Sequence, residues 1–203
     1  MPEQSSVHVY LNWAKERIDE MDAALASFEV KASQSAAEMK PKVDQLIADL
    51  KQRRDEFKAA LKSQGDAGEA AWQRAKADME TQWDGFEAQV KTYFDGLGQQ
   101  IEQQQATFKD VAAAQAKAWR EAAATFHDAA AKIAATGQAN VEAAIAQMKS
   151  DAAEAEARLQ TLKKAGTDSW AVLSAALADT RKTFDQANQA AWDALKGASS
   201  KKK

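Results

Sequence analysis

Large apolar residues recur every eleven positions through the first half of the chain. The members of this series are Phe28, Met39, Leu50, Leu61, Trp72, Trp83 and Phe94. Eleven residues make three helical turns at about 3.67 residues per turn, so this spacing keeps the side chains on one face of an α-helix with little supercoiling. The pattern therefore predicts long amphipathic helix, and no segment has the alternation typical of a strand.

The series fails after Phe94, where the segment Asp95-Gly96-Leu97-Gly98 places two glycines close together, as in a turn. The step of eleven returns in the second half, in the sets Met148, Leu159, Trp170 and Leu162, Leu173, Phe184, Leu195. We therefore expect one all-α domain, 1–203, that folds back into a long antiparallel coiled-coil helical hairpin with hendecad packing. Its parts would be a first arm over about 5–95, a turn at 96–98, a second arm over about 99–197 and a disordered basic tail at 198–203.

Side-chain size supports this hairpin. Residues whose numbers sum to 194 would face each other, and large residues then meet small ones: Trp72 faces Ala122, Ala75 faces Trp119, Met39 faces Ala155, Phe57 faces Gly137 and Phe28 faces Gly166. Two helices can keep a constant spacing when each layer has a similar total volume. Pairing residues whose numbers sum to 194 provides such layers.

The alternative is a compact bundle of four or five shorter helices. Pro41 should kink a continuous helix, and Gly65 to Gly68, Gly137 and Gly166 are positions where a helix could stop. The segment Gly65-Asp66-Ala67-Gly68-Glu69 also resembles a C-cap followed by a capping box. The eleven-residue spacing of the apolar residues nevertheless continues across these positions. This favours continuous helices in which a glycine leaves space for a large residue of the opposite arm.

A hairpin of this kind would be roughly 130 to 140 Å long at 1.5 Å per residue. Two helices bury only a narrow seam, so we expect two copies to pair into a four-helix rod. The predicted state is a homodimer or a higher homo-oligomer.

Composition restricts the classes of function. The chain has no cysteine and a net charge of −3 with both signs interspersed, so it offers no thiolate site and no basic face for nucleic acid. No run of apolar residues approaches a membrane span, and the start lacks the features of a secretory signal. We expect a soluble, cytoplasmic protein.

Candidate chemistry is sparse. The two histidines, His8 and His127, have no metal-ligand neighbour at i+4, and the two glycines at 96–98 do not form a phosphate loop. The sequence therefore predicts no catalytic residue, no cofactor and no metal, and a protein that is not an enzyme.

Six tryptophans are the most distinctive part of the composition. Four of them, Trp72, Trp83, Trp119 and Trp170, lie on the predicted seam and should pack inside it. Trp13 and Trp192 lie off the seam and are candidates for a partner-binding aromatic patch near one end of the rod.

The two ends of the rod hold the remaining candidates. Tyr93, Phe94 and Leu97 crowd the turn, where they either close the seam or form a docking tip. The tail residues Lys201, Lys202 and Lys203 are a candidate tether to an anionic surface.

The eleven-residue amphipathic pattern and the Ala, Gln, Lys and Glu content resemble those of apolipoprotein A/E-type repeats, of late-embryogenesis-abundant proteins and of phasins, the helical coats of polyester granules. Two functions follow. The first is a non-enzymatic coiled-coil scaffold or interaction protein with an unknown protein partner. The second, implied by the resemblance, is a surface-active coat whose amphipathic helices bind a membrane or a granule surface.

Overall fold

The computed structural model describes residues 6–33, 40–64, 69–96, 101–133, 135–165 and 169–200. These residues form six α-helices: α1 (Ser6–Ala32), α2 (Lys40–Ser63), α3 (Glu69–Gly96), α4 (Ile101–Ala130), α5 (Ala135–Ala165) and α6 (Trp170–Ser200). The prediction of an all-α protein is confirmed for this part of the chain, which contains no strand.

The predicted two-armed hairpin is wrong as a description of this structure. The helix α1 packs against α2, and α2 packs against α3, although all three belong to the proposed first arm and should run end to end. The predicted break after Phe94 does occur, since α3 ends at Gly96. The compact bundle, our alternative, matches the structure, with six helices in place of four or five.

Local sequence explains where two of the extra helices begin. Pro41 is the second residue of α2, in the first turn, where its missing N–H costs nothing and its fixed φ suits a helix. The helix α3 begins at Glu69, within three residues of Asp66, the N-cap of the predicted capping box, which itself lies outside the described residues. The residues between Ser63 and Glu69 are described only at Gln64, so the glycines at 65 and 68 lie outside the described residues.

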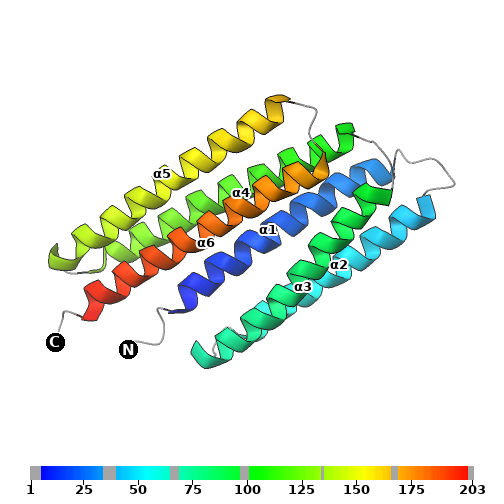
Figure 1. Ribbon diagram of the computed structural model, residues 1–203. Helices are drawn as coiled ribbons and strands as arrows, with labels where there is room; N and C mark the ends of the chain where they lie inside the picture. The colour runs from blue at the N-terminus through cyan, green and yellow to red at the C-terminus, as the bar shows by residue number, and fades with distance from the viewer. Residues whose placement is uncertain are drawn as a thin grey trace.

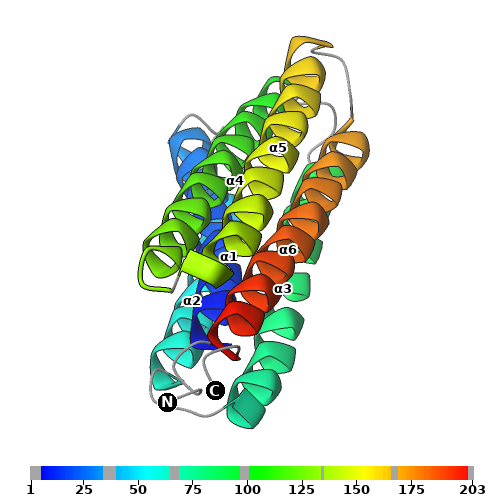
Figure 2. The same cartoon turned by 90° about the vertical axis from the view of Figure 1, so that its left-hand side faces the viewer.

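The helices form an elongated bundle with α1 at its centre (Figures 1 and 2). On one side of α1 lie α4 and α6, and α5 packs against both of them; on the other side lies the pair α2 and α3. The contact between α3 and α6 is slight. The start of α1 and the end of α6 lie at the same end of the bundle.

Buried apolar side chains form two clusters. The larger one joins α1, α2 and α3 to parts of α4, α5 and α6, and its aromatic members include Trp13, Phe28, Phe57, Trp72, Trp83, Phe94 and Trp170. The smaller one lies mainly between α4, α5 and α6 and is centred on Trp119, Phe126, Met148, Phe184 and Trp192. The helices α1, α4, α5 and α6 contribute to both clusters, whereas α2 and α3 contribute only to the larger one.

The aromatic side chains do not have the partners predicted for the hairpin, in which the numbers of facing residues sum to 194. Trp72 stacks on Tyr10 with ring centroids 5.6 Å apart, and Trp119 packs edge-on against Phe184 at 5.2 Å. A Cβ placed on Gly137 would lie 2.6 Å from the Cβ of Ala198, so this glycine faces α6 and its predicted partner Phe57 belongs to the other cluster. Large residues do meet small ones here, but between different helices.

The close approach at Gly137 leads to a prediction. A methyl group there would press on the Cα and carbonyl oxygen of Ala198, at 3.1 and 3.3 Å, so Gly137→Ala should lose about 1 kcal/mol net despite its better helix propensity. Gly197→Ala, whose Cβ would meet nothing within 4 Å, should be neutral or gain up to about 1 kcal/mol. Urea unfolding of both variants checks this, and equal effects would contradict the packing of α5 on α6.

None of the helices, over the residues described, has an apolar stretch sufficient to cross a membrane.

Candidate functional site

A network of charged side chains is buried at the centre of the bundle. The helix α1 contributes Glu16, Arg17 and Glu20, all three nearly inaccessible to solvent, and α6 contributes Arg181, which is buried as well. Buried charges are costly unless each has a partner. The arrangement of these partners is therefore what makes the burial possible.

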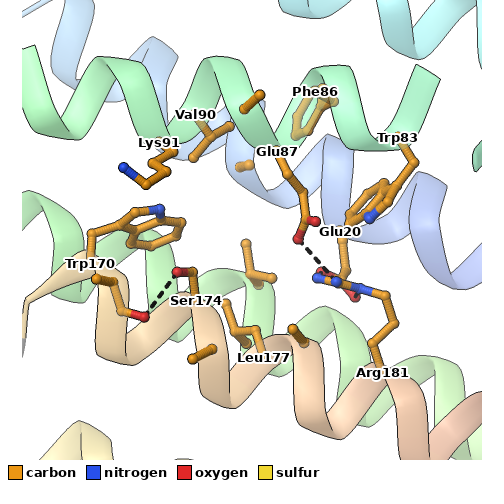
Figure 3. Close-up of a pocket in the computed structure, with 16 residues that line it drawn as sticks. Glu20, Trp83, Phe86, Glu87, Val90, Lys91, Trp170, Ser174, Leu177 and Arg181 are labelled. Atoms are coloured by element: carbon orange, nitrogen blue, oxygen red, sulfur yellow. Dashed lines mark hydrogen bonds and ion pairs between the residues drawn. The ribbon is translucent and has the colours of Figure 1, made fainter. Parts of the chain in front are cut away.

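Arg181 has the most contacts in the network. Its Nε and Nη2 donate to the two carboxylate oxygens of Glu20 at 3.1 and 2.9 Å, and its Nη1 lies 2.9 Å from Oε1 of Glu87 on α3. Its guanidinium group also lies over the ring of Trp83, 4.5 Å from the centroid. Figure 3 shows Arg181 reaching from α6 towards Glu20 and Glu87. This one side chain thus joins α6 to α1 and α3.

A second arginine makes a parallel connection. Arg17 donates to both oxygens of Asp185 on α6 at 2.8 and 2.7 Å and to Glu16 at 2.8 Å. Its guanidinium group lies 4.8 Å from the centroid of the Trp13 ring. Neighbouring amides complete the polar layer between α1, α4 and α6, because Gln115 donates to Glu20 at 2.8 Å and Asn188 donates to the carbonyl oxygen of Val9 at 2.9 Å.

Glu16 and Glu20 lie one helical turn apart and respond to burial in opposite ways. Burial, followed by the charge of Glu20, raises the pKa of Glu16 well above its ordinary value. Burial alone would also raise the pKa of Glu20, but Arg181 and the hydrogen bond from Glu16 outweigh it, so that pKa is lowered. Two like charges this close are unfavourable, and the pair is stable with the proton on Glu16.

The two arginines remain charged. Burial by itself would lower the pKa of Arg17 and of Arg181, but the carboxylates around them raise both. With Glu16 protonated, the positive charges of Arg17 and Arg181 are balanced by Asp185 and Glu20. These carboxylates, together with Glu87, offset the charges of the two arginines, which lowers the cost of burying them.

Replacing Glu16 tests whether this residue is protonated in the folded protein. Because its folded-state pKa lies above the unfolded value near 4.5, folding takes up a proton, and the stability that this contributes is lost as pH rises from about 4.5 through the folded pKa. In Glu16→Gln, whose amide imitates the protonated acid, that decline should disappear. Urea unfolding at several pH values compares the two proteins, and parallel curves would show that Glu16 is ionised in the folded state.

A hollow of about 310 Å³ adjoins the network between α3 and α6. Its walls are formed by Trp83, Phe86, Glu87 and Val90 on α3 and by Trp170, Leu177 and Arg181 on α6, and Glu20 lies at its base. The hollow exists because α6 presents small residues where it passes α3, namely Ala171, Ser174, Ala175 and Ala178.

The predicted partner-binding residues have different surroundings from those expected. Trp13 and Trp192 are both buried, in different apolar clusters, so the structure gives no exposed aromatic patch at that end. The prediction of their exposure failed because six helices enclose positions that a two-helix seam would leave outside.

Tyr93 and Phe94 are also buried. They pack against Phe28 at 4.7 and 5.5 Å, and Phe94 packs against Trp170 at 4.5 Å, so they close the core in place of forming a docking tip. Leu97 and the tether candidates Lys201, Lys202 and Lys203 lie outside the described residues. His127 is exposed on α4, and the side chain of His8 lies outside what the structure describes.

The charged network was not among the predicted sites, although the sequence contains a signal for it. Arg181 lies between Leu177 and Phe184 at spacings of four and three, on the apolar stripe of its own helix. Arg17 and Glu20 likewise continue the line of Trp13 on α1. A charged residue at an apolar position of an amphipathic helix indicates either a buried pair or a functional site.

The described residues contain no group of three or more histidines, aspartates or glutamates placed to hold a metal ion. Comparison of the chain with protein-family models, with curated proteins and with solved structures gives no match.

Proposed function

We propose that the protein is a non-enzymatic helical-bundle scaffold or interaction protein of the cytoplasm. The observation that carries this proposal is the position of the aromatic residues. All six tryptophans are buried, each at most 7% exposed. A coat that bound its surface in this closed form would need such side chains outside.

The charged network supports the same function. Its members are engaged with one another: Arg181 with Glu20 and Glu87, and Arg17 with Asp185. Such pairs are better attested as devices that fix which helices pack together than as a source of stability. The proposed role of the network is to hold one defined arrangement of α1, α3 and α6.

The surface that would meet a partner is proposed from the exposed apolar residues. Among the described residues the large ones are Val30, Ile101 and Val172, at 60%, 42% and 47% exposed. They belong to the end of α1 and the starts of α4 and α6, which lie at the same end of the bundle (Figure 1). We call this the Val30 end, and we propose that a second copy of the chain associates through it.

Light scattering coupled to size-exclusion chromatography tests the association. The wild-type chain should run as a dimer or larger assembly, and Val30→Lys combined with Val172→Lys should shift it towards the monomer. Ala139→Lys, an exposed position at the opposite end of the bundle, is the matched control and should leave the mass unchanged. A wild-type monomer at about 100 μM, a concentration at which a weak dimer would be populated, would contradict self-association.

A surface-active coat remains the second candidate because the α2–α3 pair is peripheral. Its contacts to the rest of the bundle are mainly with α1, and its inner face carries Phe57, Trp72 and Trp83. Swinging this pair away would expose those rings together with Tyr10 and Trp13. The closed bundle would then be the storage form of a coat protein.

Vesicle binding distinguishes the coat from the scaffold. Because the described residues are already nearly all helical, binding should be measured by co-sedimentation and tryptophan emission, not by a rise in helicity. A coat should sediment with anionic vesicles or polyester particles, and its emission should change as the rings leave the core. A scaffold should remain in the supernatant with unchanged emission.

A further inference from the structure

The hollow between α3 and α6 has the form of a binding site. It is an open groove because Ala171, Ala175 and Ala178 are exposed on α6 and the two helices barely touch. At one end stands Trp170, and at the other stands Trp83 with Arg181 over its ring (Figure 3). The flat apolar walls and the small base suit a compact ligand with an aromatic or branched aliphatic body.

Two carboxylates and two cations line the groove. Glu87 projects into it from α3 and Glu20 lies at its base, against one arginine, Arg181, that pairs with both. The second cation at the rim, Lys91, is paired with Asp95. Because Arg181 is shared by Glu20 and Glu87, and Lys91 is paired with Asp95, the carboxylates are the less fully neutralised charges of the groove.

Glu87 is the group that a ligand can reach. Its side chain is 41% exposed, while that of Glu20 is 2% exposed. Burial raises the pKa of Glu87, and the nearby carboxylates of Glu20 and Asp84 add to this effect, although Arg181 opposes it. A positive charge beside Glu87 would relieve that unfavourable environment.

We propose that this groove binds a small organic cation, with its ammonium group beside Glu87 and its apolar body between Trp170 and Trp83 over the alanines of α6. The volume, at the lower limit for ligand pockets, suits a body of about ten non-hydrogen atoms. This inference goes beyond the proposed scaffold function and does not rest on it.

Isothermal titration calorimetry on the full chain with three compounds of similar shape tests the proposal. These are 2-phenylethylamine, 2-phenylethanol and 3-phenylpropionate, which differ in charge. The amine should bind saturably, the alcohol about tenfold more weakly and the acid more weakly still. Equal or tighter binding of the alcohol or the acid would overturn the proposal, as would no saturable binding of the amine up to about 10 mM.

Two variants locate the site. Glu87→Gln should weaken amine binding about tenfold, while Glu154→Gln, an exposed carboxylate on α5 away from the groove, should leave it unchanged. Ala175→Phe should fill the groove and abolish binding of the amine. Circular dichroism establishes that each variant is folded, and if Ala175→Phe does not fold, Glu87→Gln decides alone. Amine binding that survives in Glu87→Gln at wild-type affinity would overturn the assignment.

Discussion

Replacing Arg181 by Met is expected to lower the free energy of unfolding by about 3 to 5 kcal/mol. The change removes both hydrogen bonds to Glu20 and leaves that carboxylate buried without its counter-charge. Burial would then dominate the pKa of Glu20 and raise it, so the loss of stability should grow with rising pH. Urea unfolding at pH 5 and pH 8 gives both quantities.

A second substitution separates the buried charge from the loss of packing. In the double variant Arg181→Met with Glu20→Gln, the only carboxylate that loses its arginine is Glu87, which is 41% exposed, so most of the lost stability should return. Lys182→Met, an exposed neighbour on α6, is the matched single variant and should change stability by less than about 0.5 kcal/mol. A double variant as unstable as Arg181→Met would mean that packing around the guanidinium group, and not its charge, is what matters.

Phe28→Ala is expected to lose about 3 to 5 kcal/mol. Phe28 is fully buried on α1 and contacts the rings of Tyr93 and Phe94 near the end of α3. Its removal would leave a cavity where α3 is attached to α1 and α6, and Phe94 would lose one of its two neighbours from other helices. Thermal unfolding by circular dichroism measures the loss.

Val30→Ala provides the comparison for Phe28→Ala. Val30 lies two residues further along α1 but is 60% exposed, so at a protein concentration too low for the proposed self-association its truncation should change stability by less than about 0.5 kcal/mol. Both changes shorten an apolar side chain near the end of one helix. Similar losses in the two would contradict the burial of Phe28 and, with it, the way in which α3 is attached.

The helices could be predicted from the sequence, but their packing could not. Eleven residues make three full turns, so the apolar phase at Trp72 follows that at Leu61 whether or not the helix is continuous between them. The regular eleven-residue spacing of the apolar residues therefore does not indicate where a helix ends. The local signals do: Pro41 suits a first turn better than an interior, and the capping box from Asp66 to Glu69 marks the first turn of a helix.

The size complementarity between distant segments misled for a related reason. A chain rich in alanine offers a small residue near almost any register, so pairs such as Trp72 with Ala122 arise without contact. The real neighbour of Trp72 is Tyr10, an aromatic residue that stacks on it. Matching of volumes becomes specific only when the set of packed helices is known.

The charged network could have been predicted in part. Arg181 on the apolar stripe of its helix and the carboxylates at Glu16 and Glu20, one turn apart, both depart from an ordinary amphipathic pattern. Their mutual pairing could not be predicted, because it depends on the packing of α6 against α1 across 161 positions of sequence. The groove beside them also depends on that packing.

The position of α1 has a consequence for the order of synthesis. Three of the polar partners of this helix are on α6: Arg181 pairs with Glu20, Asp185 pairs with Arg17, and Asn188, 179 positions away, donates to the carbonyl group of Val9. A chain emerging from the ribosome at about 5 to 20 residues per second would expose α1, without these three partners, for roughly seven to thirty seconds before α6 appeared. The helix α1 is thus completed only after α6 has been made, and a nascent chain lacking α6 should be a substrate for chaperones.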